Sequence, residues 1–464
     1  MTVVKRSINV SLNKWRRHIF LLNIIILSLI WLLPSNVLAE EKVNNYPLGL
    51  NYEVFRDSSG AVTIDDILSG KYNDEFVNSD SKYPYFGYTN DTVWLKLEKE
   101  LIGDNFNELT WLEYYNRLEV IEAYFVKSNH TYEVQEGGLN NLGDREINFR
   151  SMLFQFDPTD IETIYIKLIG EKFPVTVLSQ LYSYEGLIES IKDNKFSSGF
   201  FYGFIGSLVL YNLFLYFSLR ERVYVYYIFY LISFMLLQLF MNGLDLEYLG
   251  EYLPVWFIAD NVDFSSLLLC VAMVMFGQEF LETKKILPKL HITLSFFSRL
   301  SLLMLLFFWL IPDRILNLSA PLLALIISIL LWISALRVMQ KGNRTARLYL
   351  LGWSILLVSI ILQALSFLGI ISFRAIYFDV IPQVAACLES LLLSLALVDK
   401  INILKRQREE AQELYTEQLV KEDKMKDDFL FRTSHELKTP LHGIINISQA
   451  LIEDDDNKKE QLEK

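Results

Sequence analysis

The chain has very little cysteine. Only Cys270 and Cys387 occur in its 464 residues, and both lie inside apolar runs. The polar region that precedes residue 196 has none, so it must fold around its own hydrophobic core without disulfides. This scarcity does not exclude an extracytoplasmic location, because disulfides are permitted there but not required.

Basic residues are scarce between residues 40 and 195. This segment has twice as many Asp and Glu residues as Lys and Arg residues, and it carries the whole deficit behind the net charge of -12. An acidic segment repels nucleic acid and anionic lipid headgroups. We therefore expect no nucleic-acid partner.

Long hydrophobic runs, in contrast, are abundant. Apolar residues make up 52% of the chain and the mean hydropathy is +0.26. The excess is concentrated between Ser197 and Val398, in consecutive runs of about 20 residues, the length that crosses a bilayer. The sequence predicts a transmembrane domain over 197–398, with seven spans near 197–218, 223–241, 257–279, 292–312, 316–336, 347–370 and 376–398.

The basic residues of the connecting loops predict how the spans are oriented. The second, fourth and sixth loops contain only Arg314 and Arg374. Cytoplasmic loops are enriched in Lys and Arg, so we expect a multi-pass membrane protein with its C-terminus inside. The first, third and fifth loops contain nine basic residues: Arg220, Arg222, Lys284, Lys285, Lys289, Arg337, Lys341, Arg344 and Arg347.

The N-terminal segment 1–39 has the parts of a secretory signal peptide. A basic start precedes the apolar run "IFLLNIIILSLIWLL", and Val37 and Ala39 offer small residues for cleavage. An uncleaved membrane anchor is the alternative. Both interpretations place the following acidic segment outside the cytoplasm.

Segment 45–185 predicts an antiparallel β-sandwich. In "TVWLKLEKEL", Val93, Leu95 and Leu97 alternate with polar residues or Trp94, and similar alternation recurs near residues 164–168 and 175–177. Turn clusters such as "EGGLNNLGD" separate the runs. We expect eight or nine short strands.

The layout "YFGYTNDTVWLKLEKEL…NELTWLEYYNRLEVIEAYFV…FRSMLFQFD…TIYIKLIGEKFPVTV" resembles a known family of receptors. It is similar to the jelly-roll sensing domain of the seven-transmembrane receptors with diverse intracellular signalling modules (7TMR-DISM). This resemblance implies an unknown small-molecule or carbohydrate ligand outside the membrane. Four aromatic side chains could stack on a sugar ring or could instead fill the sandwich core: Trp94, Trp111, Tyr114 and Tyr115.

Five ionisable residues lie in or near the predicted spans: Asp260, Asp263, Arg299, Asp379 and Glu389. Such residues are costly in hydrocarbon and suggest function or pairing. Arg299 and Glu389 both lie roughly 10–14 Å from the inner end of their spans, so a buried ion pair between them is one hypothesis. Water, headgroups or backbone carbonyls are the alternative partners. A transporter is a distant alternative to a receptor, because the helix-breaking prolines Pro321 and Pro382 do not repeat between the halves of the bundle.

Glycine and proline are absent from Ser394 to Thr439, and this stretch is rich in Glu, Lys, Gln and Leu, which favour helix. We expect a cytoplasmic signalling helix over 399–424 that pairs with its copy in a homodimer. An isolated solvated helix is the alternative.

One apolar stripe follows at helical spacing in segment 425–464: Leu430, Leu437, Leu441, Ile444, Ser448 and Leu451. His435 lies about 160° around the helix from Leu437 and is therefore predicted to face solvent. Glu436 could accept a proton from one ring nitrogen, which leaves the other nitrogen free to attack phosphorus.

The stretch "SHELKTPL" is similar to the phosphoacceptor box of bacterial sensor histidine kinases. The resemblance implies that His435 is the phosphorylated histidine and Glu436 the acid/base. Thr439 would take part in dephosphorylation of the partner, and Pro440 would bend the helix. The implied partner is the receiver domain of a response regulator. His442, which no acidic residue follows, is expected to be a surface histidine, and His18, His130 and His291 form no metal-binding cluster.

A glycine-rich phosphate loop is missing from the sequence, although phosphoryl transfer needs ATP, Mg²⁺ and groups that hold the phosphates. We therefore expect no cofactor in this chain and an incomplete enzyme, a truncated phosphoacceptor domain whose ATP-binding domain would follow Lys464. The expected function is a transmembrane sensor in a two-component phosphorelay. The alternative is a non-enzymatic receptor that acts through a partner signalling protein.

Overall fold

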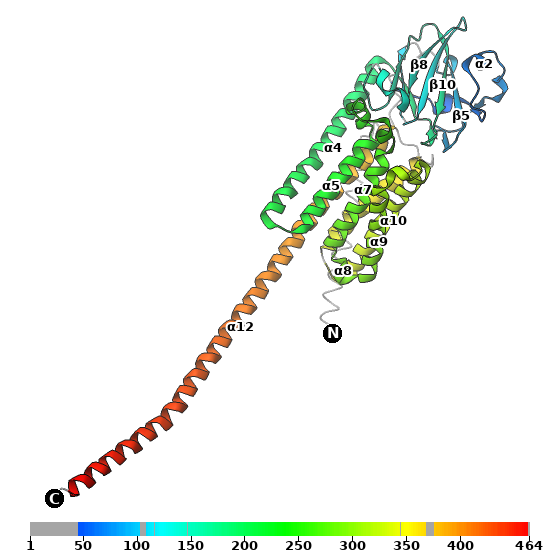
Figure 1. The fold of residues 1–464 in the computed structure, drawn as a ribbon. Coiled ribbons are helices and arrows are strands. Elements are labelled where there is room, and N and C mark those ends of the chain that lie inside the picture. Colours follow the sequence, from blue (N-terminus) through cyan, green and yellow to red (C-terminus); the bar gives the residue numbers. More distant parts are fainter. Residues whose placement is uncertain are drawn as a thin grey trace, which may run out of the picture.

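The structure is a computed structural model that describes residues 45–102, 108–115, 117–145, 147–343, 345–367 and 375–462. The predicted signal peptide and the predicted loop residues Arg344 and Arg374 lie outside these ranges. Figure 1 shows a β-rich domain at one end of a helical bundle, and a single long helix, α12, that leaves the other end.

The β-rich domain has two main antiparallel sheets, as predicted for 45–185. One has the strand order β1-β12-β6-β9 and the other has the order β3-β2-β5-β10-β7-β8, while β11 and β4 form a short ribbon. The strands are β1 (Asn45–Pro47), β2 (Glu53–Asp57), β3 (Val77–Asn78), β4 (Tyr85–Gly87), β5 (Thr92–Glu98), β6 (Trp111–Tyr114), β7 (Val120–Lys127), β8 (Tyr132–Gly137), β9 (Met152–Gln155), β10 (Ile161–Ile169), β11 (Val175–Thr176) and β12 (Ser179–Tyr182).

The described residues form more strands than the eight or nine expected. Four of these strands, β1, β3, β4 and β11, contain only two or three residues. A strand this short shows no alternation that a sequence pattern could reveal, and it forms because its neighbours in space offer backbone partners.

The predicted alternation in β5 separates two hydrophobic cores. Val93, Leu95 and Leu97 are fully buried between the sheets. Trp94 points to the opposite face, where it packs with Tyr124 beneath the short helix α2 (Ile64–Leu68). Both faces of this strand are therefore covered.

The helices continue the chain into the bundle. The short ones are α3 (Lys99–Ile102), α6 (Leu244–Tyr248) and α8 (Thr283–Ile286). The long ones are α4 (Tyr184–Leu219), α5 (Arg222–Met241), α7 (Val255–Phe280), α9 (Pro288–Leu306), α10 (Asp313–Gln340), α11 (Ala346–Phe367) and α12 (Ala375–Leu462).

Six helices in the described ranges are long and apolar enough to cross a membrane: α4, α5, α7, α9, α10 and α12. The span predicted near 347–370 corresponds to α11, whose described apolar part, Ala346–Leu362, is shorter. The number seven therefore stays a prediction.

Helix α4 begins earlier than the predicted first span. Ser183 caps it by accepting a hydrogen bond from the backbone N–H of Gly186 at 3.1 Å. Its 36 residues extend about 54 Å, whereas the hydrocarbon core is about 30 Å thick. Leu187, in the first turn, packs with Trp111 and Tyr182 of the sandwich. The helix is therefore continuous from the β-domain into the bundle.

Candidate functional site

The predicted phosphoacceptor residues lie on the exposed distal part of α12. His435, Glu436 and Thr439 are all exposed, and the helix is uninterrupted from Ala375 to Leu462. The Thr439 Oγ1 donates a hydrogen bond to the His435 carbonyl oxygen at 3.1 Å, so the two residues are one helical turn apart as predicted. The helix also continues through Pro440, and Figure 1 shows α12 as a gently curved rod.

The apolar stripe of this segment is equally exposed. Leu430, Leu437 and Leu441 are 55%, 66% and 58% exposed, and Ile444 and Leu451 are similar. Since apolar and polar faces are both uncovered, exposure by itself does not distinguish His435 from the stripe, whereas its angular position on the helix does. So many exposed large apolar side chains on one helix indicate an interaction surface.

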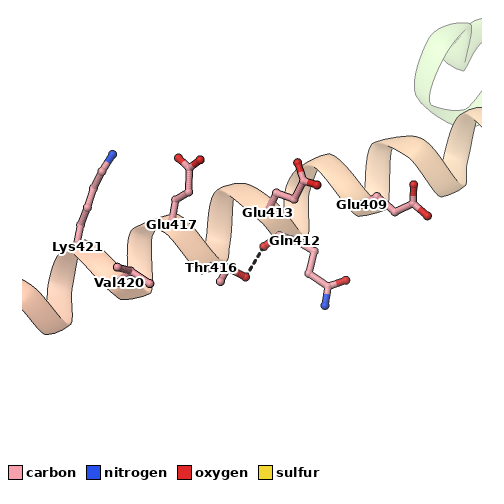
Figure 2. Close-up of a pocket in the computed structure, with 7 residues that line it drawn as sticks. All are labelled: Glu409, Gln412, Glu413, Thr416, Glu417, Val420 and Lys421. Carbon is pink, nitrogen blue, oxygen red and sulfur yellow. Dashed lines mark hydrogen bonds between the residues drawn. The ribbon is translucent and has the colours of Figure 1, made fainter.

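The part of α12 nearer the bundle presents mostly polar side chains. Figure 2 shows the seven residues of this surface, with Glu413, Glu417 and Lys421 on one side and Gln412 on the other. The Thr416 Oγ1 donates to the Gln412 carbonyl oxygen at 2.8 Å, as in an ordinary helix. One helix supplies this entire lining, so nothing in it encloses a small molecule.

The β-domain is fastened to the bundle by a buried ion pair. The Arg117 guanidinium, between β6 and β7, lies 2.6 Å from the Asp245 carboxylate of α6, which is fully buried. The same guanidinium donates to the Asn261 Oδ1 of α7 at 3.1 Å, to the Ile258 carbonyl oxygen at 3.0 Å and to that of Phe240. Removing one partner of such a pair leaves a buried charge and costs about 3–5 kcal/mol.

Hydrophobic packing continues across this junction. Leu246 of α6 and Ile258 and Ala259 of α7 belong to the same buried cluster as the sandwich core. The start of α7 is therefore part of the β-domain's core as well as part of the bundle.

A second contact joins the β-domain to the start of α10. The Lys172 ammonium lies 2.8 Å from the Asp313 carboxylate, and this hydrogen bond raises the pKa of Lys172 above its ordinary value. The Arg314 guanidinium donates to the Tyr88 carbonyl oxygen at 3.2 Å. The predicted second and fourth loops thus lie at the end of the bundle that carries the sandwich.

The predicted first, third and fifth loops meet at the opposite end. The Lys341 Nζ donates to the Ile286 carbonyl oxygen at 2.7 Å, and Arg408 of α12 pairs with Glu221 at 2.9 Å. The basic loops are therefore separated in space from the basic-poor loops, as the orientation argument requires.

Lys400 of α12 binds the end of α7 that lies away from the β-domain. Its Nζ donates to the carbonyl oxygens of Glu279 and Phe280 at 3.0 and 2.6 Å and lies 3.3 Å from the Glu282 carboxylate. The side chain is only 10% exposed and its ammonium lies over the Phe280 ring. Lys400 therefore satisfies terminal carbonyls of α7 that the helix itself leaves without partners.

The hypothesis of an Arg299–Glu389 ion pair is wrong. Glu389 is fully buried, and its Oε1 accepts a hydrogen bond from the Tyr230 hydroxyl at 2.9 Å. Arg299 is exposed on the outside of α9, and no ion pair joins the two among the described residues. Equal depth along two spans does not determine which side of each helix faces inward.

The other ionisable residues of the spans differ in how deeply they are buried. Asp263 is buried in α7 and Asp260 is half-buried. The side chain of Asp379 lies outside the described part of the chain.

Three of the four aromatic side chains considered for sugar stacking fill the β-domain. Trp94 and Tyr114 are fully buried, and Trp111 packs against Leu187 of α4. Tyr115 is partly exposed, but the Arg150 guanidinium covers its ring at 4.8 Å and its hydroxyl donates to the Met241 carbonyl oxygen. The structure favours the core interpretation for this set.

Sequence reasoning missed Arg117, Asp245 and Lys400, the polar anchors of both bundle ends. Two weak signals pointed to them. Arg117 is one of few basic residues in the acidic segment, and Lys400 is the second residue after the last apolar run. Neither signal names a partner, because the partners are more than 100 residues away.

A β-rich domain followed by several apolar helices that are long enough to cross a membrane fits a multi-pass membrane receptor. Two family models match this chain: 7TMR-DISM extracellular 2 over residues 49–179, and 7TM diverse intracellular signalling over residues 194–400. No curated protein matches it. The chain thus carries the extracellular and transmembrane domain pair of a 7TMR-DISM receptor. The matched ranges end before His435.

Proposed function

We propose that this receptor is the input part of a sensor histidine kinase of the bacterial cytoplasmic membrane. A ligand outside would shift the β-domain, the bundle would transmit the shift, and α12 would control phosphorylation of His435 in a homodimer. The observation that carries the proposal is the position of His435 on the face of α12 opposite the apolar stripe, on a helix that leaves the bundle without interruption.

Two features of α12 support this chemistry. His435 lies away from the exposed apolar stripe, so pairing of two stripes in a dimer leaves its imidazole open to a mobile partner. Glu436 is adjacent and exposed, so its carboxylate can take the proton from one ring nitrogen. The other nitrogen then attacks the γ-phosphorus of ATP, the bond from phosphorus to the bridging oxygen breaks, and ADP leaves.

ATP and Mg²⁺ would be held by an ATP-binding domain, which the described residues do not contain, and the phosphoryl group would pass to an aspartate of a response-regulator receiver domain. Thr439, one turn from His435 on the same face, is placed to orient the water or the aspartate in that exchange.

The test is phosphorylation of the chain in trans. When a full-length kinase partner and ATP are supplied, we expect acid-labile phosphate on the wild-type chain and essentially none on His435→Gln, because glutamine has no nucleophilic ring nitrogen. Incorporation is measured with radiolabelled ATP followed by acid and base treatment.

His442→Gln is the matched control, since it changes a second exposed histidine two turns further along α12 and should retain the phosphate. Equal labelling of wild type and His435→Gln would contradict the proposal and would favour a non-enzymatic receptor that works through a partner.

A further inference from the structure

Helix α7, like α4, contacts both the β-domain and α12, and it does so through polar contacts at its two ends. At its outer end α7 carries Ile258 and Asn261, which accept hydrogen bonds from Arg117 of the β-domain. At its inner end the carbonyl oxygens of Glu279 and Phe280 accept hydrogen bonds from Lys400 of α12. The 26 residues of α7 extend about 39 Å, the full depth of a bilayer.

The packing of α7 suits it to act as a rigid element. In the described residues, 72% of its most apolar window is buried, more than in any other candidate span. It packs against α5, α9 and α10, and Figure 1 shows it running from the β-domain to α8. A close-packed helix shifts as a unit because its neighbours leave little room for local deformation.

The inner contact is built to hold α12 firmly. Lys400 is buried and combines two backbone hydrogen bonds, an ion pair with Glu282 and contact with the Phe280 ring. Glu282 has a left-handed backbone (φ 49), which ends α7 at this point and brings its carboxylate to Lys400. The remaining described ion pair from α12 to the bundle, Arg408 with Glu221, is more exposed.

We propose that α7 transmits movement of the sensing domain to the output helix, with Arg117 and Lys400 as the positioning residues at its two ends. This rests on the proposed function in treating α12 as the output element. A shift of the β-domain moves α7 through the hydrogen bonds of the Arg117 guanidinium to Ile258 and Asn261. Helix α7 then moves α12 through the hydrogen bonds of Lys400.

The experiment follows α12 directly, with cysteines at Glu221 and Arg408 in a chain whose Cys270 and Cys387 are replaced by alanine. The Arg408 guanidinium lies 2.9 Å from the Glu221 carboxylate, so the two positions face each other across the length of two long side chains. The rate at which a short bifunctional maleimide cross-links the two cysteines in membranes therefore reports how α12 sits on the bundle. The readout is intramolecular and requires neither a second copy nor phosphate.

Arg117→Ala serves as the stimulus, because the natural ligand is unidentified. We expect it to change the cross-linking rate by about fivefold or more, a size comparable with the weaker couplings found between two sites of one protein. Arg56→Ala, which removes an exposed pair with Asp91 in the same domain, should leave the rate unchanged.

Lys400→Met should abolish the response to Arg117→Ala, whereas Lys405→Met, at an exposed position of α12, should preserve it. If the Arg117→Ala chain does not reach the membrane, Arg117→Lys replaces it. That variant keeps the charge beside Asp245 but cannot reach Asn261 and Ile258 at once, so a smaller shift of the same sign is expected.

The inference is overturned if neither Arg117 variant moves the rate, or if the shift is the same in the Lys400→Met background. Coupling without phosphate on His435 would refute the proposed function and leave this inference standing. Phosphate on His435 without coupling would refute this inference and leave the proposed function standing.

Discussion

The β-domain contains no cysteine, and buried side chains hold some of its turns by hydrogen bonds. Asp57, at the end of β2, is 4% exposed and accepts hydrogen bonds from Ser59 Oγ at 2.6 Å, Ser59 N–H at 2.9 Å and Val62 N–H at 3.0 Å. Burial alone would raise the pKa of Asp57, but these hydrogen bonds outweigh it and hold the pKa below its ordinary value. The carboxylate therefore fixes the turn that leads to α2.

Because the pKa of Asp57 is lower in the folded state, its stabilisation is present above the ordinary value of 3.8 and is lost as the pH falls through the folded-state pKa. We expect Asp57→Asn to lower the free energy of unfolding by about 1–3 kcal/mol at pH 7. Thermal unfolding of the detergent-solubilised chain, followed by near-ultraviolet circular dichroism, measures this difference.

The difference between wild type and Asp57→Asn should narrow as the pH falls below about 4, because the carboxylate then binds a proton in the unfolded state and, at still lower pH, in the folded state. A gap of constant size between pH 7 and pH 3 would mean that the charge of Asp57 contributes nothing. Asp74→Asn, at an exposed position of the same domain, is the control.

At the scale of the element, one continuous helix, α12, carries two different surfaces. Its bundle-proximal part carries a row of acidic residues, Glu409, Glu413 and Glu417, at intervals of four, which is mildly unfavourable in an isolated helix. Its distal part carries the exposed apolar stripe. A helix with both features gains stability from a partner on the apolar side.

We therefore expect Leu441→Asp to weaken self-association, since it places a charge in the stripe that two copies would bury. The dissociation constant of the dimer should rise tenfold or more, which corresponds to about 1.4 kcal/mol. Light scattering of the full chain in detergent measures the oligomeric state.

Asn446→Asp adds the same charge about 140° around the helix from Leu441 and should leave the dimer intact. Equal dissociation of both variants, or a monomeric wild type, would contradict pairing through the stripe.

At the scale of the whole molecule, the two ends of the bundle differ in charge and in partner. The end that carries the β-domain is joined to it by Arg117 and Lys172, and the opposite end collects the basic loops and the start of the free part of α12. Both features predict one orientation, with the β-domain outside and the C-terminus in the cytoplasm.

Single cysteines test this orientation in intact cells. Tyr252→Cys, near the β-domain, should react with a membrane-impermeant maleimide, whereas Lys285→Cys, at the opposite end, should react only after the membrane is opened. Both positions are strongly exposed, at 80% for Tyr252 and 82% for the Lys285 side chain, so burial cannot explain a difference. The reverse labelling pattern would place His435 outside the cell and would contradict the kinase proposal.

The sequence alone determined the elements whose pattern is periodic and local. Val93, Leu95 and Leu97 marked a strand because side chains alternate along it, and long apolar runs marked the bundle because a bilayer requires them. The stretch around His435 predicted its chemistry from adjacent residues.

Only the tertiary structure decided which distant residues meet. It paired Arg117 with Asp245, placed Lys400 on the end of α7, and gave Glu389 to Tyr230 rather than to Arg299. The physical reason is that the strength of a buried polar contact changes when the donor–acceptor distance shifts by a few tenths of an ångström or when the donor angle departs from linear. Spacing along the chain does not encode these between residues more than 100 positions apart.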